Sequence, residues 1–311
     1  MLFSKKRFML GAAVALLSAT TVFAQEDDDN LQPLRTHSLY MPYIDQDLQN
    51  RWFDFGGDAL INTNRHVRLT QDMPSQSGWL WSRLPLEVSN FQIEFEFAVG
   101  GKGDNLFGDG FAVWLTKERA EPGPVFGSRD HFEGLGIFFD TYENGRSPHT
   151  FPYVLAMMGD GRTKYDNDND GSNNKLGGCE SNFRGRTETT KGRLTYSRDT
   201  SSLNLKIQTQ FWDQWDDCFT LQDIKLPELP YLGFTAHTGE VHDNHDIVSV
   251  TTSTMVKAPQ LLGHTRNTAP PPSSKSGLGW YLKFLAISGV FVGVVAVAYN
   301  MSKKSNDMKR F

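Results

Sequence analysis

Short segments in which apolar and polar residues alternate fill the middle of this chain, and they limit its fold more than any other feature. In the clearest of them, residues 91–97 (FQIEFEF), aromatic and aliphatic side chains fall on one face and Gln and Glu side chains on the other, as in a strand buried on one side only. No helical pattern of roughly ten residues or more stands out between residues 31 and 256. The sequence therefore predicts an all-β domain over residues 31–256, a two-sheeted antiparallel β-sandwich. Further strand-like segments, separated by turn signals, cover residues 110–116, 135–140, 153–158, 193–196, 203–208, 232–237 and 247–256.

The two ends of the chain carry different patterns. Residues 1–24 combine a basic start, an apolar centre and a Val-Phe-Ala ending, which is typical of a cleaved secretory signal peptide. Residues 278–299 are apolar except for Lys283, and their length suits one membrane-spanning helix. A linker rich in Pro and Ser covers residues 257–277, and the tail, residues 300–311, is basic. The positive-inside rule places the tail in the cytosol and the β-domain in the lumen, as in a single-pass type I membrane protein.

Composition and cysteine content agree with a luminal domain. The 311 residues are 39% hydrophobic, enough for a large core, and the formal net charge of −5 comes without the basic cluster that nucleic-acid binding needs. Cys179 and Cys218 lie inside the β-rich region. In the oxidising lumen that the signal peptide predicts, we expect them to form a disulfide, and two buried free thiols are the alternative.

Oxygen-bearing side chains concentrate in two stretches, residues 140–144 and 166–170. Asp140 follows an apolar strand, and the spacing Asp140-x-Tyr142-x-Asn144 lets the next turn wrap around a cation. The second stretch adds Asp170 and two further aspartates. Calcium takes roughly six to eight oxygen ligands of these kinds. We therefore expect a calcium site, with a solvated acidic loop as the alternative.

The run 166–171 (DNDNDG) also matches the first half of an EF-hand loop. The last ligand position of such a loop is a bidentate Glu. Here that position is Gly177, and no helical pattern flanks the run. An EF-hand is therefore excluded.

Three other patterns leave alternatives open. Asp109 stands between two glycines, where a carboxylate can approach a ligand closely or simply serve a turn. Residues 237–246 hold three histidines, and their spacing favours a polar loop over a histidine metal site. Glu94 and Glu96 have the spacing of glycosidase acids on a strand, but a solvated strand face is favoured. No nucleophile motif or phosphate loop occurs, so we predict binding rather than catalysis.

Six motifs, taken together and in order, resemble the leguminous-type (L-type) lectins of the early secretory pathway: GDGFAVW, GLGIFFDTYEN, FPYVLAMMGDG, YDNDNDG, GGCESNFR and HTGEVHDNHDI. The resemblance covers residues 31–256. Within this family, the chain is most similar to the group that contains the vesicular integral membrane lectin and the ERGIC cargo receptor. Its short linker, single span and basic tail resemble those of the vesicular integral membrane lectin more than those of the cargo receptor. The resemblance implies a concanavalin-like jelly roll that binds high-mannose N-glycans with Ca2+ and is not an enzyme.

The resemblance also implies roles for individual residues. It implies calcium ligands at Asp140, the Tyr142 carbonyl, Asn144 and Asp170. It implies carbohydrate contacts at Asp109, Asn144 and Asn167, and in the loop of Gly239, Glu240 and Val241. It matches Cys179 and Cys218 to the family's disulfide and implies a cis peptide between Gly108 and Asp109.

Three positions depart from the family pattern. Asn167 stands where a histidine is usual, and its amide does not titrate between pH 5 and 8, so we expect glycan release to be less steep on acidification. Glu240 replaces a Gly or Asp, which bears on the preferred mannose arm. Trp79 lies near the family's small Ser contact, so we expect that contact to be lost or moved.

The complete pattern predicts a transmembrane cargo receptor or quality-control factor for high-mannose glycoproteins in the ER, the ER–Golgi intermediate or the Golgi. The tail resembles transport signals that coat proteins bind. Lys309 fits a dilysine signal but Met308 does not, and a simple topology anchor is the alternative. Two rivals remain for the domain itself: a glycan-modifying enzyme on the same sandwich, and a protein-binding adaptor without glycan affinity.

Overall fold

The computed structural model describes residues 30–145, 147–187, 190–210 and 214–256. By its internal contacts the chain separates into two units, Met1–Ala258 and Pro259–Phe311, and every residue described belongs to the first. The predicted signal peptide, linker, membrane helix and cytosolic tail lie outside the described residues. Within the described ranges, no helix is long and apolar enough to cross a membrane.

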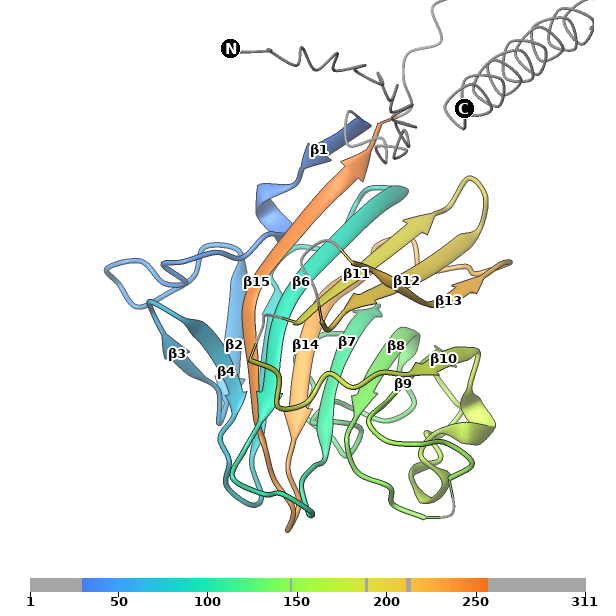
Figure 1. Ribbon diagram of the computed structural model, residues 1–311. Coiled ribbons are helices and arrows are strands. Elements are labelled where there is room, and N and C mark those ends of the chain that lie inside the picture. Colours follow the sequence, from blue (N-terminus) through green and yellow to red (C-terminus); the bar gives the residue numbers. More distant parts are fainter. Residues whose placement is uncertain (1–29, 146, 188–189, 211–213, 257–311) are drawn as a thin grey trace, which may run out of the picture. The chain divides into compact units, whose positions relative to one another are not determined.

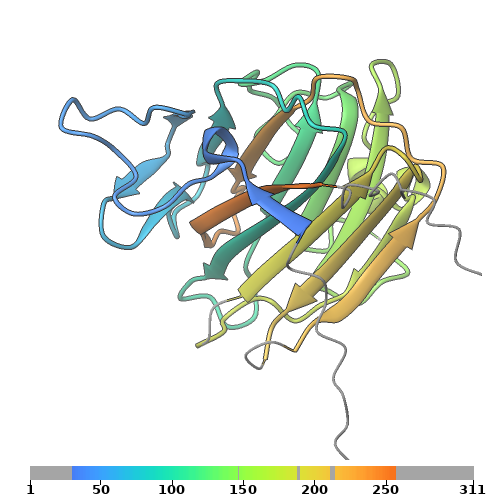
Figure 2. The same ribbon diagram turned by 90° about the horizontal axis from the view of Figure 1, so that it is seen from above.

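The described residues form two antiparallel sheets that lie face to face (Figures 1 and 2), so the predicted all-β sandwich is confirmed. The first sheet has the order β13-β12-β11-β6-β15-β4-β3, with β1 paired to β15, and the second has the order β10-β9-β8-β7-β14-β5-β2. The strands of the first sheet are β1 (Leu31–Pro33), β3 (Leu60–Asn62), β4 (His66–Thr70), β6 (Asn90–Gly100), β11 (Thr190–Ser197), β12 (Ser202–Gln208), β13 (Asp216–Leu221) and β15 (Asn244–Met255). Those of the second are β2 (Phe53–Gly57), β5 (Ser77–Ser82), β7 (Gly110–Thr116), β8 (Glu133–Asp140), β9 (Tyr153–Asp160), β10 (Gly177–Glu180) and β14 (Tyr231–His237). The described residues also include the short 3-10 helices η2 (Arg35–His37), η3 (Asn167–Asn169) and η4 (Ser172–Asn174).

Several strands were not expected from the sequence because they are short or interrupted by glycine and polar residues. In β5 (SGWLWS), Gly78 lies where the two sheets approach closely, and a Cβ at this position would stand 1.9 Å from the Leu69 carbonyl oxygen. The glycine that weakens the strand pattern is therefore the residue that allows this approach.

Aromatic side chains fill the space between the sheets. Burial alternates along nearly all of β6, which places Phe95 and Phe97 with their ring centroids 5.8 and 5.2 Å from that of Phe139 in β8. Phe111 of β7 stacks on Phe139 at 4.5 Å. Aromatic pairs contribute roughly 0.5–1.5 kcal/mol beyond the area they bury. This cluster therefore fixes β7 and β8 relative to the first sheet.

The second sheet is buried on its other face as well. Phe138 of β8 packs against Phe126, Phe132 and Tyr165, which come from the segments that connect β7 to β8 and β9 to β10. Every residue of β7 is buried, and this explains why its sequence is a continuous apolar run. The covering segments hold Phe126 and Tyr165 beside the end of β8.

A disulfide joins the edges of the two sheets. Cys179 lies in β10, the edge of the second sheet, and Cys218 lies in β13, the edge of the first. The predicted pairing is confirmed, and the two sheets are held together by a covalent bond as well as by their core.

Candidate functional site

Neighbouring strands of the second sheet bring polar residues together at one rim. Asp109 immediately precedes β7, Asp140 ends β8 and His237 ends β14. Gly110, the first residue of β7, pairs with both Asp140 and His237. The antiparallel register therefore makes neighbours of Asp109 and His237, which are 128 positions apart in the sequence. The Gly108–Asp109 peptide is cis, as expected.

Asp140, Asn144 and Asp170 form a compact group of oxygen-bearing side chains. Asp140 is 5% exposed and Asp170 is 4% exposed. Asp140 Oδ1 accepts a hydrogen bond from the backbone N–H of Tyr142 at 3.0 Å. Asp170 Oδ1 accepts from both the backbone N–H and the side-chain amide of Asn144, each at 3.0 Å. The structure thus brings together the four residues for which the sequence predicts calcium ligation.

The electrostatics of this group favour a cation. Burial raises the pKa of Asp140 well above its usual range, and the charges of Asp170 and Asp109 raise it further. Burial likewise raises the pKa of Asp170. Asp170 Oδ2 is buried and has no hydrogen-bond partner among the described residues, which is costly for a carboxylate. Two carboxylates, an amide oxygen and a backbone carbonyl are ligands that calcium prefers, so these residues fit the ion.

A cavity of about 360 Å³ adjoins the acidic group. Asp109, Asn144 and Asn167 supply hydrogen-bonding groups to its wall, and Phe126 and Tyr165 supply aromatic surface. Ligand sites commonly combine an apolar wall with a few placed polar groups. This combination suits a ring that carries hydroxyl groups on its edge and C–H groups on its face. The remaining lining residues are Pro124, Val125, Asp130, Asp140, Lys164, Asp168 and His237.

The loop after β14 packs against the same rim. A Cβ on Gly239 would lie 3.5 Å from both carboxylate oxygens of Asp109, so the loop backbone passes directly beside that carboxylate. A Cβ on Gly108 would lie 2.9 Å from Tyr142 Cβ and 3.0 Å from Val241 Cγ2. Gly239 and Val241 are therefore near the other predicted contacts, whereas Glu240 is exposed and does not line the cavity.

The three departures from the family pattern have different outcomes. Asn167 lines the cavity from η3. Trp79 of β5 does not line it, and its ring instead covers Gly56 of the neighbouring strand, where a Cβ would lie 2.4 Å from Cζ2 of the indole. Glu240 is exposed and lies outside the lining of the cavity.

Phe126, Tyr165 and His237 line the cavity but were not among the predicted ligand contacts. The sequence places His237 among three histidines of one segment, and only strand pairing shows which of them faces the cavity. His237 Nδ1 lies 3.0 Å from Asp109 Oδ2. Its position at the end of an apolar strand, like that of Asp140, was the available signal.

The histidine metal site is not formed. His237 contacts Asp109, His242 Nδ1 lies 2.7 Å from Asp72 Oδ1, and His245 is buried against Thr70. In the part of the chain that the structure describes, no three His, Cys, Asp or Glu side chains are grouped to hold a metal. The predicted calcium ligands include only two carboxylates, and the others are an amide and a backbone carbonyl.

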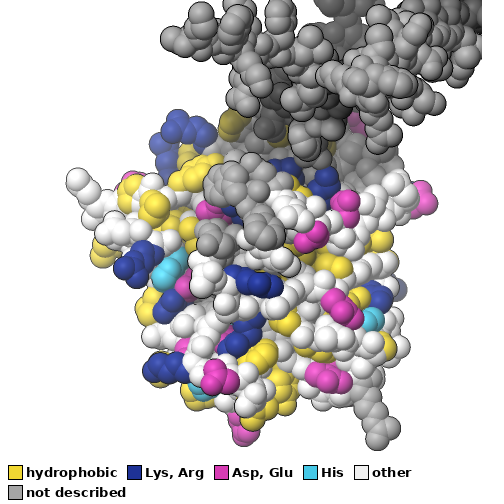
Figure 3. Space-filling view, viewed as in Figure 1, with side chains coloured by type: hydrophobic (Ala, Val, Ile, Leu, Met, Phe, Trp, Pro, Cys, Tyr) yellow, Lys and Arg dark blue, Asp and Glu magenta, His cyan; other side chains and the backbone are white. Residues whose placement is uncertain are grey.

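The glycosidase alternative for Glu94 and Glu96 is also not supported. On the outer face of β6, Glu94 pairs with Arg193 at 3.0 Å and Glu96 with Lys191 at 2.8 Å, across the β6–β11 register. Neither acid lines the cavity beside Asp109. The side chains of Glu94 and Glu96 are 26% and 25% exposed, so the pair belongs to a solvated strand face. Charged side chains of both signs are also interspersed over the face shown in Figure 3.

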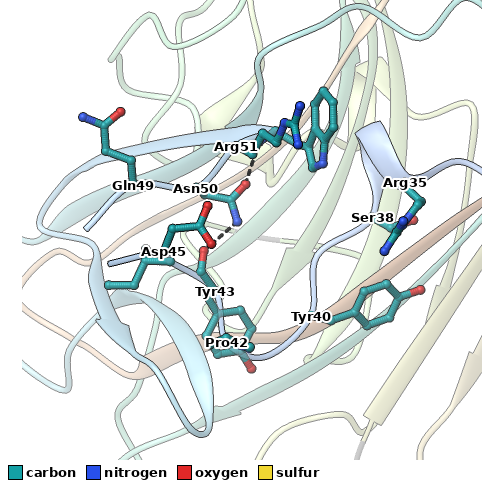
Figure 4. A pocket seen from close by; sticks show the side chains of 11 residues that line it. Arg35, Ser38, Tyr40, Pro42, Tyr43, Asp45, Gln49, Asn50 and Arg51 are labelled. Atoms are coloured by element: carbon teal, nitrogen blue, oxygen red, sulfur yellow. Dashed lines mark hydrogen bonds between the residues drawn. The ribbon is translucent and has the colours of Figure 1, made fainter. Parts of the chain in front are cut away.

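A second hollow, of about 430 Å³, lies beside the loop that precedes β2 (Figure 4). No predicted site residue lines it. The Asn50 amide donates to the Tyr43 carbonyl at 2.6 Å, and its oxygen accepts from the backbone N–H groups of Trp52 and Phe53, each at 2.8 Å. The polar atoms of Asn50 thus form hydrogen bonds within the loop and are not available to a ligand. Although this hollow is larger than the cavity beside Asp109, it is the less suitable binding site.

Comparison with known proteins points to one family. The family model described as the legume-like lectin family matches residues 30–260. An L-type lectin-like domain-containing protein of Schizosaccharomyces pombe is 39% identical over 257 residues, covering 82% of this chain and 80% of the relative. The VIP36-like protein of Mus musculus is 34% identical over 299 residues, covering 89% and 85%. The crystal structure of the VIP36 exoplasmic/lumenal domain in its Ca2+/Man2-bound form matches with a TM-score of 0.68 at 35% identity, covering 75% of this chain and 92% of that domain.

Proposed function

The chain belongs to the legume-like lectin family, and on that premise we propose that it is a calcium-dependent lectin that binds high-mannose N-glycans on glycoproteins. The observation that carries the proposal is the meeting of Asp109, Asn144 and the buried acidic group beside one cavity. A Ca2+- and Man2-bound form of the similar VIP36 domain supports the same two ligands for this chain.

The acidic group gives the calcium ion its role. Asp140, the Tyr142 carbonyl, Asn144 and Asp170 would hold the ion, which supplies positive charge among carboxylates that otherwise repel each other. Asn144 links this group to the cavity, because its amide and backbone N–H both bond to Asp170 while its side chain lines the wall. Its orientation is therefore set before a flexible glycan arrives, which lowers the entropy cost of binding.

Residues of the cavity wall would make the sugar contacts. The Asp109 carboxylate accepts hydrogen bonds from hydroxyl groups, and hydrogen bonds to an ionised group are the stronger kind. Asn144 and Asn167 both donate and accept, and the backbone beside Gly239 closes the rim. Phe126 and Tyr165 offer aromatic faces to the C–H surface of the sugar ring. No group in this set is arranged to break a glycosidic bond, so we propose binding without turnover.

The ends of the chain support a role in transport. With residues 1–24 as a signal peptide and residues 278–299 as a membrane span, the lectin domain is luminal and residues 300–311 are cytosolic. We propose a cargo receptor or quality-control factor that moves between the ER and the Golgi, with coat proteins bound at the basic tail. Loss of ER–Golgi distribution in cells after truncation at residue 299 would test this part of the proposal.

The calcium requirement is tested with an Asp140→Asn variant. We expect it to weaken binding of the full chain to high-mannose glycans by roughly 100-fold or more, because the ion loses a buried charged ligand. Binding is measured on a glycan array with calcium and with a chelator. Asp217→Asn, an exposed aspartate of β13, is the matched control and should leave binding unchanged.

Two results separate the rival functions. Recovery of shortened or transferred glycan after incubation with the full chain would favour an enzyme, whereas intact glycan favours a lectin. Equal binding of glycosylated and deglycosylated cargo, insensitive to chelator, would contradict the lectin and favour an adaptor.

A further inference from the structure

Arg184 does not line the cavity beside Asp109, but it contacts two of the connections that form the rim. It lies in residues 181–187, the described part of the connection that leads from β10 in the second sheet to β11 in the first (Figure 1). Its backbone pairs with Val99 of β6 in a parallel bridge. Phe183, the residue before it, is fully buried in the core between the sheets. The side chain of Arg184 therefore starts from a fixed point of the fold.

The guanidinium group of Arg184 joins these two connections by hydrogen bonds. Nε and Nη2 donate to the two carboxylate oxygens of Asp243, each at 2.8 Å. Nη2 also donates to the Gly103 carbonyl at 2.8 Å. Asp243 ends the connection from β14 to β15, and Gly103 lies in the connection from β6 to β7. The Asp243 side chain is 0% exposed and that of Arg184 only 14%, and a buried pair with two parallel hydrogen bonds holds both partners in one geometry.

An aromatic ring adds a second contact to the connection from β6 to β7. Arg184 Cζ lies 3.6 Å from the centroid of the Phe107 ring, and a cation over an aromatic face is attracted to it. Phe107 directly precedes Gly108. A Cβ on Gly108 would lie 3.0 Å from Val241 Cγ2, so the two connections also touch each other at the rim. Arg184 thus supports this contact from outside the cavity.

We propose that Arg184 is a positioning residue of the glycan site, which sets the distance between Asp109 and the backbone of Gly239 and Val241 by holding the two connections together. The inference rests on the proposed lectin function and concerns the same site. Neither Arg184 nor the groups that it bonds to line the cavity. Arg184 therefore acts on a sugar only through the positions of the two connections.

The predicted calcium ligands are held by other bonds. Asp140 accepts from the Tyr142 N–H, and Asp170 accepts from Asn144. In the described part of the chain, the hydrogen bonds and the ion pair of Arg184 go to Asp243 and to the Gly103 carbonyl, and not to these ligands. A change at Arg184 should therefore lower the affinity for the sugar and leave the affinity for calcium as it is.

The test compares the full chain, purified in detergent, with its Arg184→Lys variant. Lysine keeps a positive charge beside the buried Asp243 but lacks the planar fork that bonds to both carboxylate oxygens and to the Gly103 carbonyl. Binding of the mannose disaccharide at saturating calcium, and binding of calcium to the calcium-free protein, are titrated calorimetrically. Urea unfolding gives the stability of each protein. We expect the mannose affinity of the variant to fall about tenfold, with calcium affinity unchanged.

Arg68→Lys is the matched control. Arg68 also donates two hydrogen bonds to a buried aspartate, Asp246, at 2.7 and 2.8 Å. It joins the strands β4 and β15 and does not line the cavity. Its variant should lose a similar amount of stability and keep the wild-type affinity for mannose. Phe107→Leu is a second test, because it leaves the Asp243 pair in place, and it should weaken mannose binding about threefold.

The outcomes separate this inference from the proposed function. Wild-type mannose affinity in Arg184→Lys would overturn the role of Arg184 and leave the lectin intact, as would wild-type affinity in Phe107→Leu should Arg184→Lys fail to fold. Equal losses of mannose affinity in Arg184→Lys and Arg68→Lys, or a parallel loss of calcium affinity in Arg184→Lys, would also overturn it, because general destabilisation then explains the effect. Absence of calcium-dependent mannose binding by the wild type would remove the proposed function and this inference together.

Discussion

At the scale of the residue, the histidines of this protein differ in burial and in hydrogen bonding, and their roles differ accordingly. His237 is partly exposed and bonds to a carboxylate beside a cavity. His245, in contrast, is buried: its Nδ1 lies 2.6 Å from Thr70 Oγ1, and its Nε2 has no hydrogen-bond partner among the described residues. Burial, with a contribution from the charge of Arg184, lowers the pKa of His245 to about 3. His245 is therefore a neutral core residue.

Burial of His245 makes stability depend on pH. In the unfolded chain the His245 imidazole takes up a proton near the ordinary pKa of about 6.5, whereas in the folded protein it stays neutral until the pH approaches about 3. The free energy of unfolding is therefore highest above pH 6.5 and decreases as the pH falls toward 3. From pH 7 to pH 5 we expect this residue to remove about 2 kcal/mol of unfolding free energy. Urea unfolding of wild type and His245→Gln at both pH values measures it. Equal losses in the two proteins would contradict the assignment.

At the scale of the element, close packing of the paired strands β6 and β11 depends on a missing side chain. Gly192 of β11 pairs with Phe95 of β6, and a Cβ at Gly192 would stand 2.2 Å from Cζ of that ring. The ring has little freedom to move, because it also packs against Phe97, Phe139 and Phe234. The glycine thus makes room for the aromatic core.

Gly192→Ala should therefore destabilise the domain by about 1–3 kcal/mol through overpacking. Gly100→Ala, at the end of β6, is the comparison: a Cβ there finds its nearest neighbour 3.8 Å away, and its effect should stay within about 0.5 kcal/mol. Thermal and urea unfolding give both values. Equal effects of the two substitutions would show that Phe95 moves aside.

At the scale of the whole molecule, the described sandwich is closed at one side by a disulfide. Cys179 and Cys218 are 39 positions apart in the sequence and join the edge strands of different sheets. Loop closure of this length stabilises a fold by about 4 kcal/mol on the chain-entropy model. We expect the double variant Cys179→Ala and Cys218→Ala to lose up to that amount in urea unfolding, and treatment of the wild type with a reductant should approach the same value. An unchanged midpoint in both would contradict a stabilising role.

The architecture was predictable where pattern and environment agree, as in β6, whose alternation matches its burial nearly to the end. Short strands such as β5 were not predictable, because its Gly78 is required by the close approach of the Leu69 carbonyl and weakens the strand pattern in the sequence. The acidic group around Asp140 and Asp170 followed from residue type and resemblance. Spacing alone does not show that Asp109 and His237 meet, because their contact depends on pairing between β7 and β14.

The strand pairing that places Gly110 opposite Asp140 and His237 also determines where the side chains of the rim lie. Side chains alternate across a strand, so sliding β8 by one step along β7 would carry Asp140 about 3.4 Å away and turn it to the opposite side. Phe111 and Phe139, locked together in the interior, oppose that slide. The packing of these phenylalanine rings in the core thus sets the spacing of the oxygen atoms that could bind an ion. A substitution at Phe111 or Phe139 should therefore weaken the affinity of the proposed site for calcium.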